Sequence, residues 1–347
     1  MQASRLRVDD FDYPLPGDAI AQTPAEPRDA SRLLILDRAT GSVTHTRFRD
    51  IGQWLEPSDL LVVNDSRVIP ARLRGTRPGG GAVELLVLRS IDDGSGRWEA
   101  LARPSRRLAD GAVVTLHSGD RVTVGERLAH GSRAVSFEDD PQRVMAAAGE
   151  MPLPPYIHAR SAPDERYQTV YARPPGSAAA PTAGLHFTRQ LLDSLDATGV
   201  RRASVTLHVG LDTFQPLHGE YVDEHRIHRE WYEIPNATRA AIAEANRVVA
   251  IGTTAVRVLE TAARAEASSG WTDLYITPPH AFATVGALVT NFHLPRSSLL
   301  LLVTAFVQAG MPSADAMAAR DRLLNAYAVA IRAGYRFFSF GDAMLIV

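Results

Sequence analysis

An α/β protein is the fold class that this sequence of 347 residues predicts: a discontinuous α/β sandwich domain interrupted by a small antiparallel β-barrel domain. Two observations predict it. Before residue 71 and after residue 150, apolar, β-branched runs alternate with helical patterns, as in α/β sheets. Residues 71–150 instead carry short alternating runs separated by Gly, Asp and Pro, a pattern typical of a small antiparallel barrel. We therefore assign residues 1–70 and 151–347 to the α/β domain and 71–150 to an inserted domain.

The amino-acid composition limits the classes of protein, partner and chemistry that this sequence can represent. The hydrophobic content of 45%, the charged content of 22% and the net charge of -2 are those of a soluble globular protein. A nucleic-acid partner would therefore meet a local basic patch rather than a basic surface. The absence of cysteine excludes disulfides, thiolate metal sites and cysteine nucleophiles. Residues 1–8 are polar and no apolar run is long enough to span a bilayer, so we expect a cytoplasmic protein without a membrane partner.

The N-terminal part reads as loop and then as strands. A buried strand is predicted at 33–37, a hairpin partner at 43–48 and one or two helical turns at 51–55. Residues 59–63 form the next predicted strand, which runs directly into Asn64-Asp65-Ser66-Arg67. This polar cluster is either an Asx-type turn that satisfies its own backbone or a strand end that faces a ligand.

The predicted barrel is basic in its first half. Its arginines are either solvated surface or contacts for phosphate groups. They are Arg72, Arg74, Arg77, Arg89, Arg103, Arg106 and Arg107.

The sequence around residues 174–216 organises the rest of the chain. Residues 178–184 have little side-chain volume, which allows the backbone to approach a ligand closely. Thr188 is a suitable N-cap for a helix at 189–197, and a strand is predicted at 202–209. His186 and His208 thus fall where the chain enters or leaves regular structure, and each is either packed or a ligand contact.

The C-terminal part repeats the strand-then-polar pattern. A helix at 235–246 precedes a strand at 247–251, which ends in Gly252-Thr253-Thr254 before a helix at 255–267. Such a junction is either purely structural or binds an anion, for instance the carboxylate of an amino-acid-like ligand. A strand that ends in Asn291-Phe292-His293 comes next. The remaining elements are predicted as a helix at 297–306, a loop at 307–316, a helix at 317–332 and a strand and turn at 335–344.

The polar strand ends point to one site. Asn64-Asp65, His208, Thr253-Thr254 and Asn291 to His293 all follow predicted strands, so we expect them at one crevice of a parallel sheet. His225 and His228 have a spacing that suits a metal, but no further ligand frame accompanies them. We therefore expect no metal site.

Several motifs together resemble a known family. They include SRLLILDR, DLLVVNDSRVIPARLRG, MPLPPYI, PTAGLHFT, VTLHVG, IGTTAVRVLE, LVTNFHLPRSSLLLLV and YRFFSFGDAMLI. These motifs resemble those of the S-adenosylmethionine:tRNA ribosyltransferase-isomerases of queuosine biosynthesis. They occur in the same order as in that family and span nearly the whole chain. The resemblance implies an α/β domain interrupted by a β-barrel.

The resemblance also implies an activity. Such an enzyme transfers and isomerises the ribosyl part of S-adenosylmethionine onto 7-aminomethyl-7-deazaguanine at the tRNA wobble position. Epoxyqueuosine-tRNA forms, and adenine and methionine leave. S-adenosylmethionine is then a co-substrate, no prosthetic group is required, and tRNA is the macromolecular partner. We expect a monomer or a weak homodimer.

This chemistry suggests roles for the matched residues. The sulfonium acidifies the adjacent C5′ protons, so a histidine base suits the reaction, and adenine leaves more easily when an acid protonates it. The catalytic candidates are His186, His208, His293 and Asp65. Tyr171, Phe187 and Phe292 are candidates for stacking on a base. The other substrate-binding candidates are Asn64, Arg67, Thr182, Gly184, Gly210, Thr253, Thr254 and Asn291. The candidates for tRNA phosphate contacts are Arg72, Arg74, Arg166 and Arg336.

Three segments depart from the family pattern, namely 211–212, 277–282 and 307–316. One alternative is therefore a paralogue that uses S-adenosylmethionine on another amine or nucleoside. A non-catalytic RNA-binding protein is the other. A methyltransferase is disfavoured because a glycine-rich first βα turn is missing.

Overall fold

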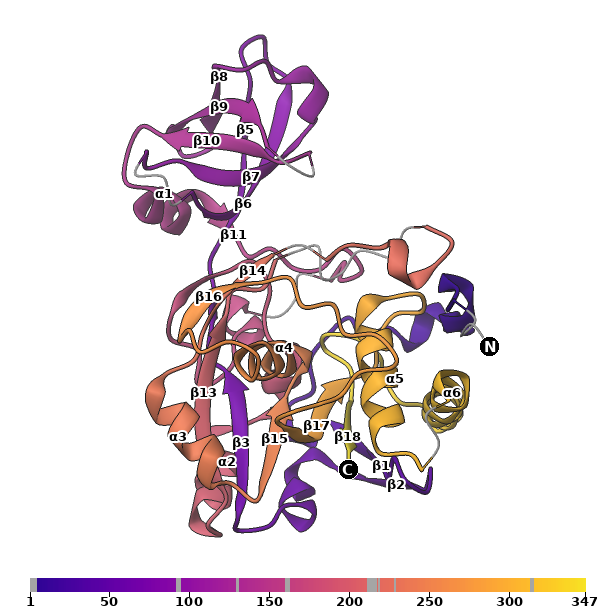
Figure 1. Cartoon of the computed structure of the whole chain (residues 1–347). Coiled ribbons are helices and arrows are strands. Elements are labelled where there is room, and N and C mark those ends of the chain that lie inside the picture. The colour runs from indigo at the N-terminus through magenta and orange to yellow at the C-terminus, as the bar shows by residue number, and fades with distance from the viewer. Residues whose placement is uncertain are drawn as a thin grey trace. The chain divides into compact units, whose positions relative to one another are not determined.

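The computed structural model (Figure 1) describes residues 5–91, 95–128, 131–159, 163–210, 217, 219–227, 229–312 and 315–347. The chain divides into two compact units. Unit 1 comprises Met1–Ser66, Pro155–Pro174 and Ala180–Val347, and unit 2 comprises Arg67–Pro154 and Pro175–Ala179. No helix in the described part of the chain has both the length and the apolar character needed to cross a membrane.

A nine-stranded mixed sheet forms the centre of unit 1. Four neighbouring strands, in the order β13-β3-β15-β17, run parallel to one another. β18 then pairs antiparallel with β17 and parallel with β1. The full order is β16 (Ser269–Thr272), β14 (Glu230–Glu233), β13 (Arg201–Leu207), β3 (Asp59–Asn64), β15 (Arg247–Ile251), β17 (Val285–Asn291), β18 (Ala343–Ile346), β1 (Arg32–Leu36) and β2 (Val43–Arg47).

The central strands form because both of their faces are covered. All six residues of β3 are buried, as a near-continuous apolar sequence in a covered parallel sheet predicts. Leu61 and Val63 of β3 pack in the same apolar cluster as Leu192 and Leu195 of α2 (Arg189–Ala197). Because successive strand side chains alternate, Leu60 and Val62 face the other side of the sheet.

Helices cover this sheet, and polar side chains define where three of them begin. The Thr188 hydroxyl accepts a hydrogen bond from the Leu191 amide, so the predicted cap and the predicted bounds of α2 are confirmed. Ser297 caps α5 (Ser298–Ala309) in the same way, and Asp315 caps α6 (Ala316–Arg332). α5 and α6 lie side by side (Figure 1). The others are α3 (Asn236–Glu244) and α4 (Thr253–Ala262), and α4 packs on β13, β15 and β17.

Short 3-10 helices connect these elements. They are η1 (Val8–Phe11), η2 (Gly17–Ala19), η3 (Arg28–Ala30), η4 (Phe48–Trp54), η7 (Asp164–Tyr167), η8 (Thr182–His186) and η10 (Val222–Glu224) in unit 1, and η5 (Ser105–Arg107) in unit 2.

Three element predictions in the C-terminal part are wrong in their bounds. The predicted loop at 307–316 is too long, because α5 continues to Ala309 with Val307 buried, and Gly310 is the C-cap of the helix. The helix predicted at 255–267 ends at Ala262, before polar residues. Of the strand and turn predicted at 335–344, the strand is β18, which begins only at Ala343, because the aromatic residues before it pack into the core from a turn. Phe338 has a φ of 68° there, which no strand accommodates.

Unit 2 is a closed antiparallel barrel. Six strands follow one another in the order β5-β6-β7-β10-β9-β8, and pairing of β8 with β5 closes the circle. Closure removes free strand edges and buries Leu73, Leu85 and Val122. The predicted fold class is thereby confirmed.

The strands of this barrel are β5 (Arg72–Thr76), β6 (Ala82–Ser90), β7 (Trp98–Arg103), β8 (Ala112–Leu116), β9 (Arg121–Arg127) and β10 (Arg133–Phe137). The unit also contains α1 (Pro141–Ala148), β11 (Gly149–Glu150) beside β5, and a parallel pair of β4 (Arg67–Val68) and β12 (Pro175–Ser177).

Candidate functional site

The polar strand ends of unit 1 share one edge of the sheet. β13, β3, β15 and β17 are parallel neighbours, so their carboxyl ends lie together. Asn64 and Asn291 are the last residues of β3 and β17, and His208 directly follows β13. Gly252 follows β15 with a φ of 90°, a conformation that favours glycine, and α4 starts at the next residue.

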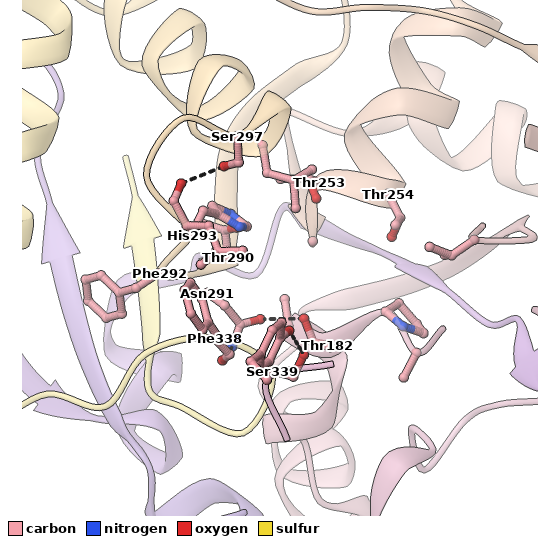
Figure 2. Close-up of a pocket in the computed structure, with 18 residues that line it drawn as sticks. Thr182, Thr253, Thr254, Thr290, Asn291, Phe292, His293, Ser297, Phe338 and Ser339 are labelled. Atoms are coloured by element: carbon pink, nitrogen blue, oxygen red, sulfur yellow. Dashed lines mark hydrogen bonds between the residues drawn. The ribbon is translucent and has the colours of Figure 1, made fainter. Parts of the chain in front are cut away.

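A cavity of about 670 Å³ opens in unit 1, and its walls come from this edge (Figure 2). The lining side chains are mostly small, hydroxyl-bearing or aromatic, and the space that they surround is open to solvent. The lining residues are Tyr156, Ala180, Pro181, Thr182, Ala183, Val209, Gly252, Thr253, Thr254, Thr290, Asn291, Phe292, His293, Leu294, Ser297, Leu299, Phe338 and Ser339.

A hydrogen-bonded chain runs from Thr182 away from this cavity. The Thr182 hydroxyl donates to the Asn291 side-chain oxygen at 3.0 Å (Figure 2). The Asn291 amide nitrogen donates to the Phe338 carbonyl at 3.2 Å and lies 3.1 Å from His186 Nε2. Since that nitrogen is a donor, His186 Nε2 accepts and the ring proton is on Nδ1, which reaches the Ser31 hydroxyl at 2.8 Å.

His186 is therefore a neutral imidazole with both nitrogens engaged. Its ring stacks on Phe48 at a centroid distance of 4.9 Å and is almost fully buried. Burial, with smaller contributions from Arg336 and Arg28, lowers the pKa of His186 from 6.5 to about 3. This environment suits a residue that orients Asn291 better than one that removes a proton from a substrate.

His293 is the one of the three candidate histidines that lines the cavity, and all three are in the described part of the chain. Its Nε2 lies 2.8 Å from the Thr290 hydroxyl, and its backbone amide donates to the Tyr327 hydroxyl at 3.1 Å. Burial lowers the pKa of His293 to about 3, so the imidazole is neutral at physiological pH.

His208 and Asp65 lie near each other at the adjacent strand ends, outside the cavity lining. The His208 ring stacks on Trp231 at 5.2 Å, and its buried Nδ1 has no hydrogen-bond partner among the described residues. Burial lowers the pKa of His208, and Asp65 opposes that shift. The Asp65 carboxylate accepts from the Thr206 hydroxyl at 2.8 Å and from Arg173 at 3.2 Å.

The Asn64 side chain forms hydrogen bonds with the backbone of Leu207 and Ser66. Its side chain accepts from the Leu207 amide at 3.0 Å and donates to the Leu207 carbonyl at 3.1 Å. It also accepts from the Ser66 amide, so the Asx-turn interpretation is correct for this residue.

Of the two candidate glycines, Gly184 is a site of close approach, and Gly210 forms a hydrogen bond through its backbone amide. A Cβ on Gly184 would lie 2.0 Å from the Tyr171 hydroxyl, which is buried and has no hydrogen-bond partner among the described residues. The Gly210 amide donates to the Glu230 carboxylate at 2.8 Å. Arg67 is in β4 of unit 2.

Two predicted stacking residues belong to the core. Phe187 has no exposed surface, and its ring meets Phe48 edge-on at 4.8 Å. Phe292 is equally buried, and its ring packs on Phe337 at 4.7 Å, pointing away from the polar side chains of the cavity (Figure 2). The expected stacking of a substrate base on Phe187 or Phe292 is therefore corrected, because both rings are buried against other aromatic rings, although Phe292 belongs to the cavity lining.

The sequence did not indicate a buried ion pair beside the cavity. Arg257 of α4 pairs with Glu230 of β14, and both side chains are only 7% exposed. Arg257 also donates to the Leu274 and Thr272 carbonyls. Because Glu230 binds the Gly210 amide, the pair fixes the segment that brings Val209 to the cavity. The available signal was an arginine between valines in an apolar helical pattern.

The four arginines expected to contact phosphate already have protein partners. Arg72 donates to the Leu153 carbonyl, and Arg74 lies 3.7 Å from Glu84 and 3.5 Å from Glu150. Arg166 lies 3.1 Å from Glu26, and Arg336 lies 3.8 Å from Asp342. The side chain of Arg166 is 18% exposed, that of Arg336 36% and that of Arg74 42%.

The described residues include only part of the segments that concern the metal hypothesis and the family departures. No group of three or more potential ligands occurs in the described ranges, while His228 and residues 211–212 lie outside them. In segment 277–282, Phe282 packs edge-on against Phe306 at 5.1 Å. None of those six residues, all described, lines the cavity.

The two buried histidines predict acid sensitivity. Both pKa values are about 3 in the folded protein and 6.5 when unfolded, so the unfolded chain binds more protons below pH 6.5. The free energy of unfolding should fall between pH 6.5 and 3 by up to about 1.4 kcal/mol per pH unit for each histidine. Urea unfolding at several pH values measures this. His186→Gln and His293→Gln should each give a shallower slope, and slopes equal to wild type would contradict the assignment.

Known proteins match this chain over nearly its full length. Residues 8–346 match the family model described as a queuosine biosynthesis protein. A protein of Rubrobacter xylanophilus is 50% identical over 342 residues, which cover 99% of this chain and 98% of the relative. One of Moorella thermoacetica is 49% identical over 355 residues, covering 99% of this chain and all of the relative. Both are named S-adenosylmethionine:tRNA ribosyltransferase-isomerase.

A solved structure supports the same assignment. The crystal structure of S-adenosylmethionine tRNA ribosyltransferase from Thermotoga maritima is 39% identical, with a TM-score of 0.55. The match covers 97% of this chain and 100% of that one. The resemblance predicted from the motifs is confirmed, and the chain belongs to the queuosine biosynthesis protein family.

Proposed function

We propose that this protein transfers and isomerises the ribosyl moiety of S-adenosylmethionine onto 7-aminomethyl-7-deazaguanine at the tRNA wobble position, releasing adenine and methionine. The observation that carries this proposal is the full-length match to relatives named for that enzyme. The cavity at the carboxyl edge of the parallel strands supports it, because this is where open α/β sheets bind ligands.

S-adenosylmethionine is the proposed occupant of the 670 Å³ cavity. The start of α4 contributes Gly252, Thr253 and Thr254 to the lining, and no side chain caps this helix. Its first backbone N–H groups therefore suit the methionine carboxylate. The hydroxyl of Thr182 and the amide of Asn291, which bond to each other, suit the ribose hydroxyls.

His293 is the proposed base for the C5′ proton next to the sulfonium. It lines the cavity, which neither His186 nor His208 does. Asp65 and His208 are kept as candidates for the group that protonates adenine. His186 is a positioning residue in this proposal, since it acts through Asn291.

The macromolecular partner in this proposal is tRNA. We propose that Arg72, Arg74, Arg166 and Arg336 contact its phosphates by exchanging their present partners. The division into an α/β domain of residues 1–70 and 151–347 and an inserted domain of residues 71–150 is part of this proposal, as is the monomer or weak homodimer.

A product assay tests the proposal. Purified protein is incubated with S-adenosylmethionine and tRNA that carries 7-aminomethyl-7-deazaguanine, and the tRNA nucleosides and small molecules are identified by mass spectrometry. We expect adenine and methionine in equal amounts together with epoxyqueuosine in the tRNA. tRNA with unmodified guanine at the wobble position is the control. Adenine release without modification of this tRNA would favour a paralogue with another acceptor, and no release would exclude the activity.

A further inference from the structure

A second cavity of about 250 Å³ lies in unit 1. Its lining includes Arg28, Arg166, His186 and Ser339. Ser339 also lines the larger cavity, and His186 bonds to Asn291 of that cavity. The two spaces therefore adjoin across one hydrogen-bonded wall.

The smaller cavity is cationic. Arg28 donates to the carbonyls of Gln168 and Glu165 at 2.8 and 2.9 Å, which fixes its guanidinium in place. It also donates to the Leu185 carbonyl at 3.4 Å. Burial and then the charge of Arg166 lower the pKa of Arg28, so the two guanidinium groups lie close enough to repel each other.

Two carboxylates act on this cluster, because the charges of Glu26 and Glu165 both raise the pKa of Arg28. Glu26 lies 3.1 Å from Arg166 but its side chain is 79% exposed. Arg166 is otherwise bonded to the Ala25 carbonyl at 2.6 Å, with its side chain only 18% exposed. An exposed carboxylate leaves such a pair at little cost in free energy, since surface ion pairs contribute little. An incoming anion can therefore replace the Glu26 carboxylate beside Arg166.

We propose that Arg28 and Arg166 bind a phosphodiester group of the RNA substrate in this second cavity, beside the S-adenosylmethionine cavity. This inference rests on the proposed function for its choice of RNA. Planar guanidinium forks match the oxygens of a phosphate, and two of them around one anion relieve their mutual repulsion. The alternative anion is the methionine carboxylate, which the uncapped start of α4 can hold in the larger cavity.

Binding measurements test this without turnover. The affinity for tRNA is measured by filter binding at several salt concentrations, and the affinity for S-adenosylmethionine by calorimetry. Arg166→Gln and Arg28→Lys should each weaken tRNA binding about tenfold, and Arg166→Gln should reduce the salt slope by about one. Glu26→Gln removes the competing carboxylate and should tighten tRNA binding. Arg201→Ala, which breaks an exposed ion pair with Glu244, is the matched control and should change neither affinity.

The outcomes separate the two proposals. Weaker S-adenosylmethionine binding with unchanged tRNA binding would overturn the phosphodiester assignment and place a carboxylate in the cavity. Unchanged affinities for both ligands would overturn the site itself, whatever the activity of the wild type. If the wild type binds tRNA with the expected response to these variants but forms no product, the proposed reaction fails while the site stands.

Discussion

His293→Gln is expected to lower kcat by about 10²- to 10⁴-fold, the usual contribution of a general base. The substituted amide retains a polar group near Thr290, which holds the histidine at 2.8 Å, so the cavity wall is preserved. The dissociation constant of S-adenosylmethionine should therefore change little. Single-turnover release of adenine measures the chemical step, and calorimetry measures binding.

Two other histidine variants make this prediction specific. His117→Gln, at an exposed position in unit 2, should leave kcat unchanged. His208→Gln should affect the rate less than His293→Gln, because His208 does not line the cavity. If His208→Gln has the larger effect, the base is His208 and the assignment of His293 is wrong. A flat pH profile of kcat/KM between pH 5 and 8 is also expected of a base with a pKa of about 3.

Arg257→Ala should destabilise unit 1 by about 3–5 kcal/mol, because it leaves the buried Glu230 carboxylate without its counter-ion. The same substitution removes the donors to the Leu274 and Thr272 carbonyls. Urea unfolding followed by tryptophan fluorescence reports mainly on this unit, which contains Trp54, Trp231 and Trp271, while Trp98 is in unit 2. The cavity should also lose affinity for S-adenosylmethionine, since Glu230 holds Gly210 next to Val209.

Matched variants separate charge from packing. Arg201→Ala removes an arginine whose side chain is 41% exposed and should cost less than about 1 kcal/mol. The double variant Arg257→Met with Glu230→Gln removes both charges while an amide oxygen remains for the Gly210 amide. It should recover much of the stability that Arg257→Ala loses. Equal stability of Arg257→Ala and Arg201→Ala would refute a structural role for the buried pair.

Much of the fold was predictable because local patterns and burial agree. β-branched apolar runs coincide with β3, β15 and β17, and the hydroxyl of Thr188 defines the start of α2 where the sequence predicted it. The predicted bounds of elements are wrong where tertiary packing overrides the local secondary-structure preference of the residues. The aromatic residues before β18 look like strand formers, yet they enter the core from a turn in which Phe338 has a positive φ.

The sequence by itself determined the fold class, the family and the strand ends that carry polar side chains. It did so because strand and helix periodicities, caps and family motifs are properties of neighbouring residues. Only the tertiary structure decided what each side chain does. It placed His293 in the cavity, His186 behind Asn291, and Phe187 and Phe292 in the core. Burial, hydrogen-bond partners and the approach of Arg28 to Arg166 depend on contacts between residues far apart in the chain. The spacing of residues along a sequence does not contain those contacts.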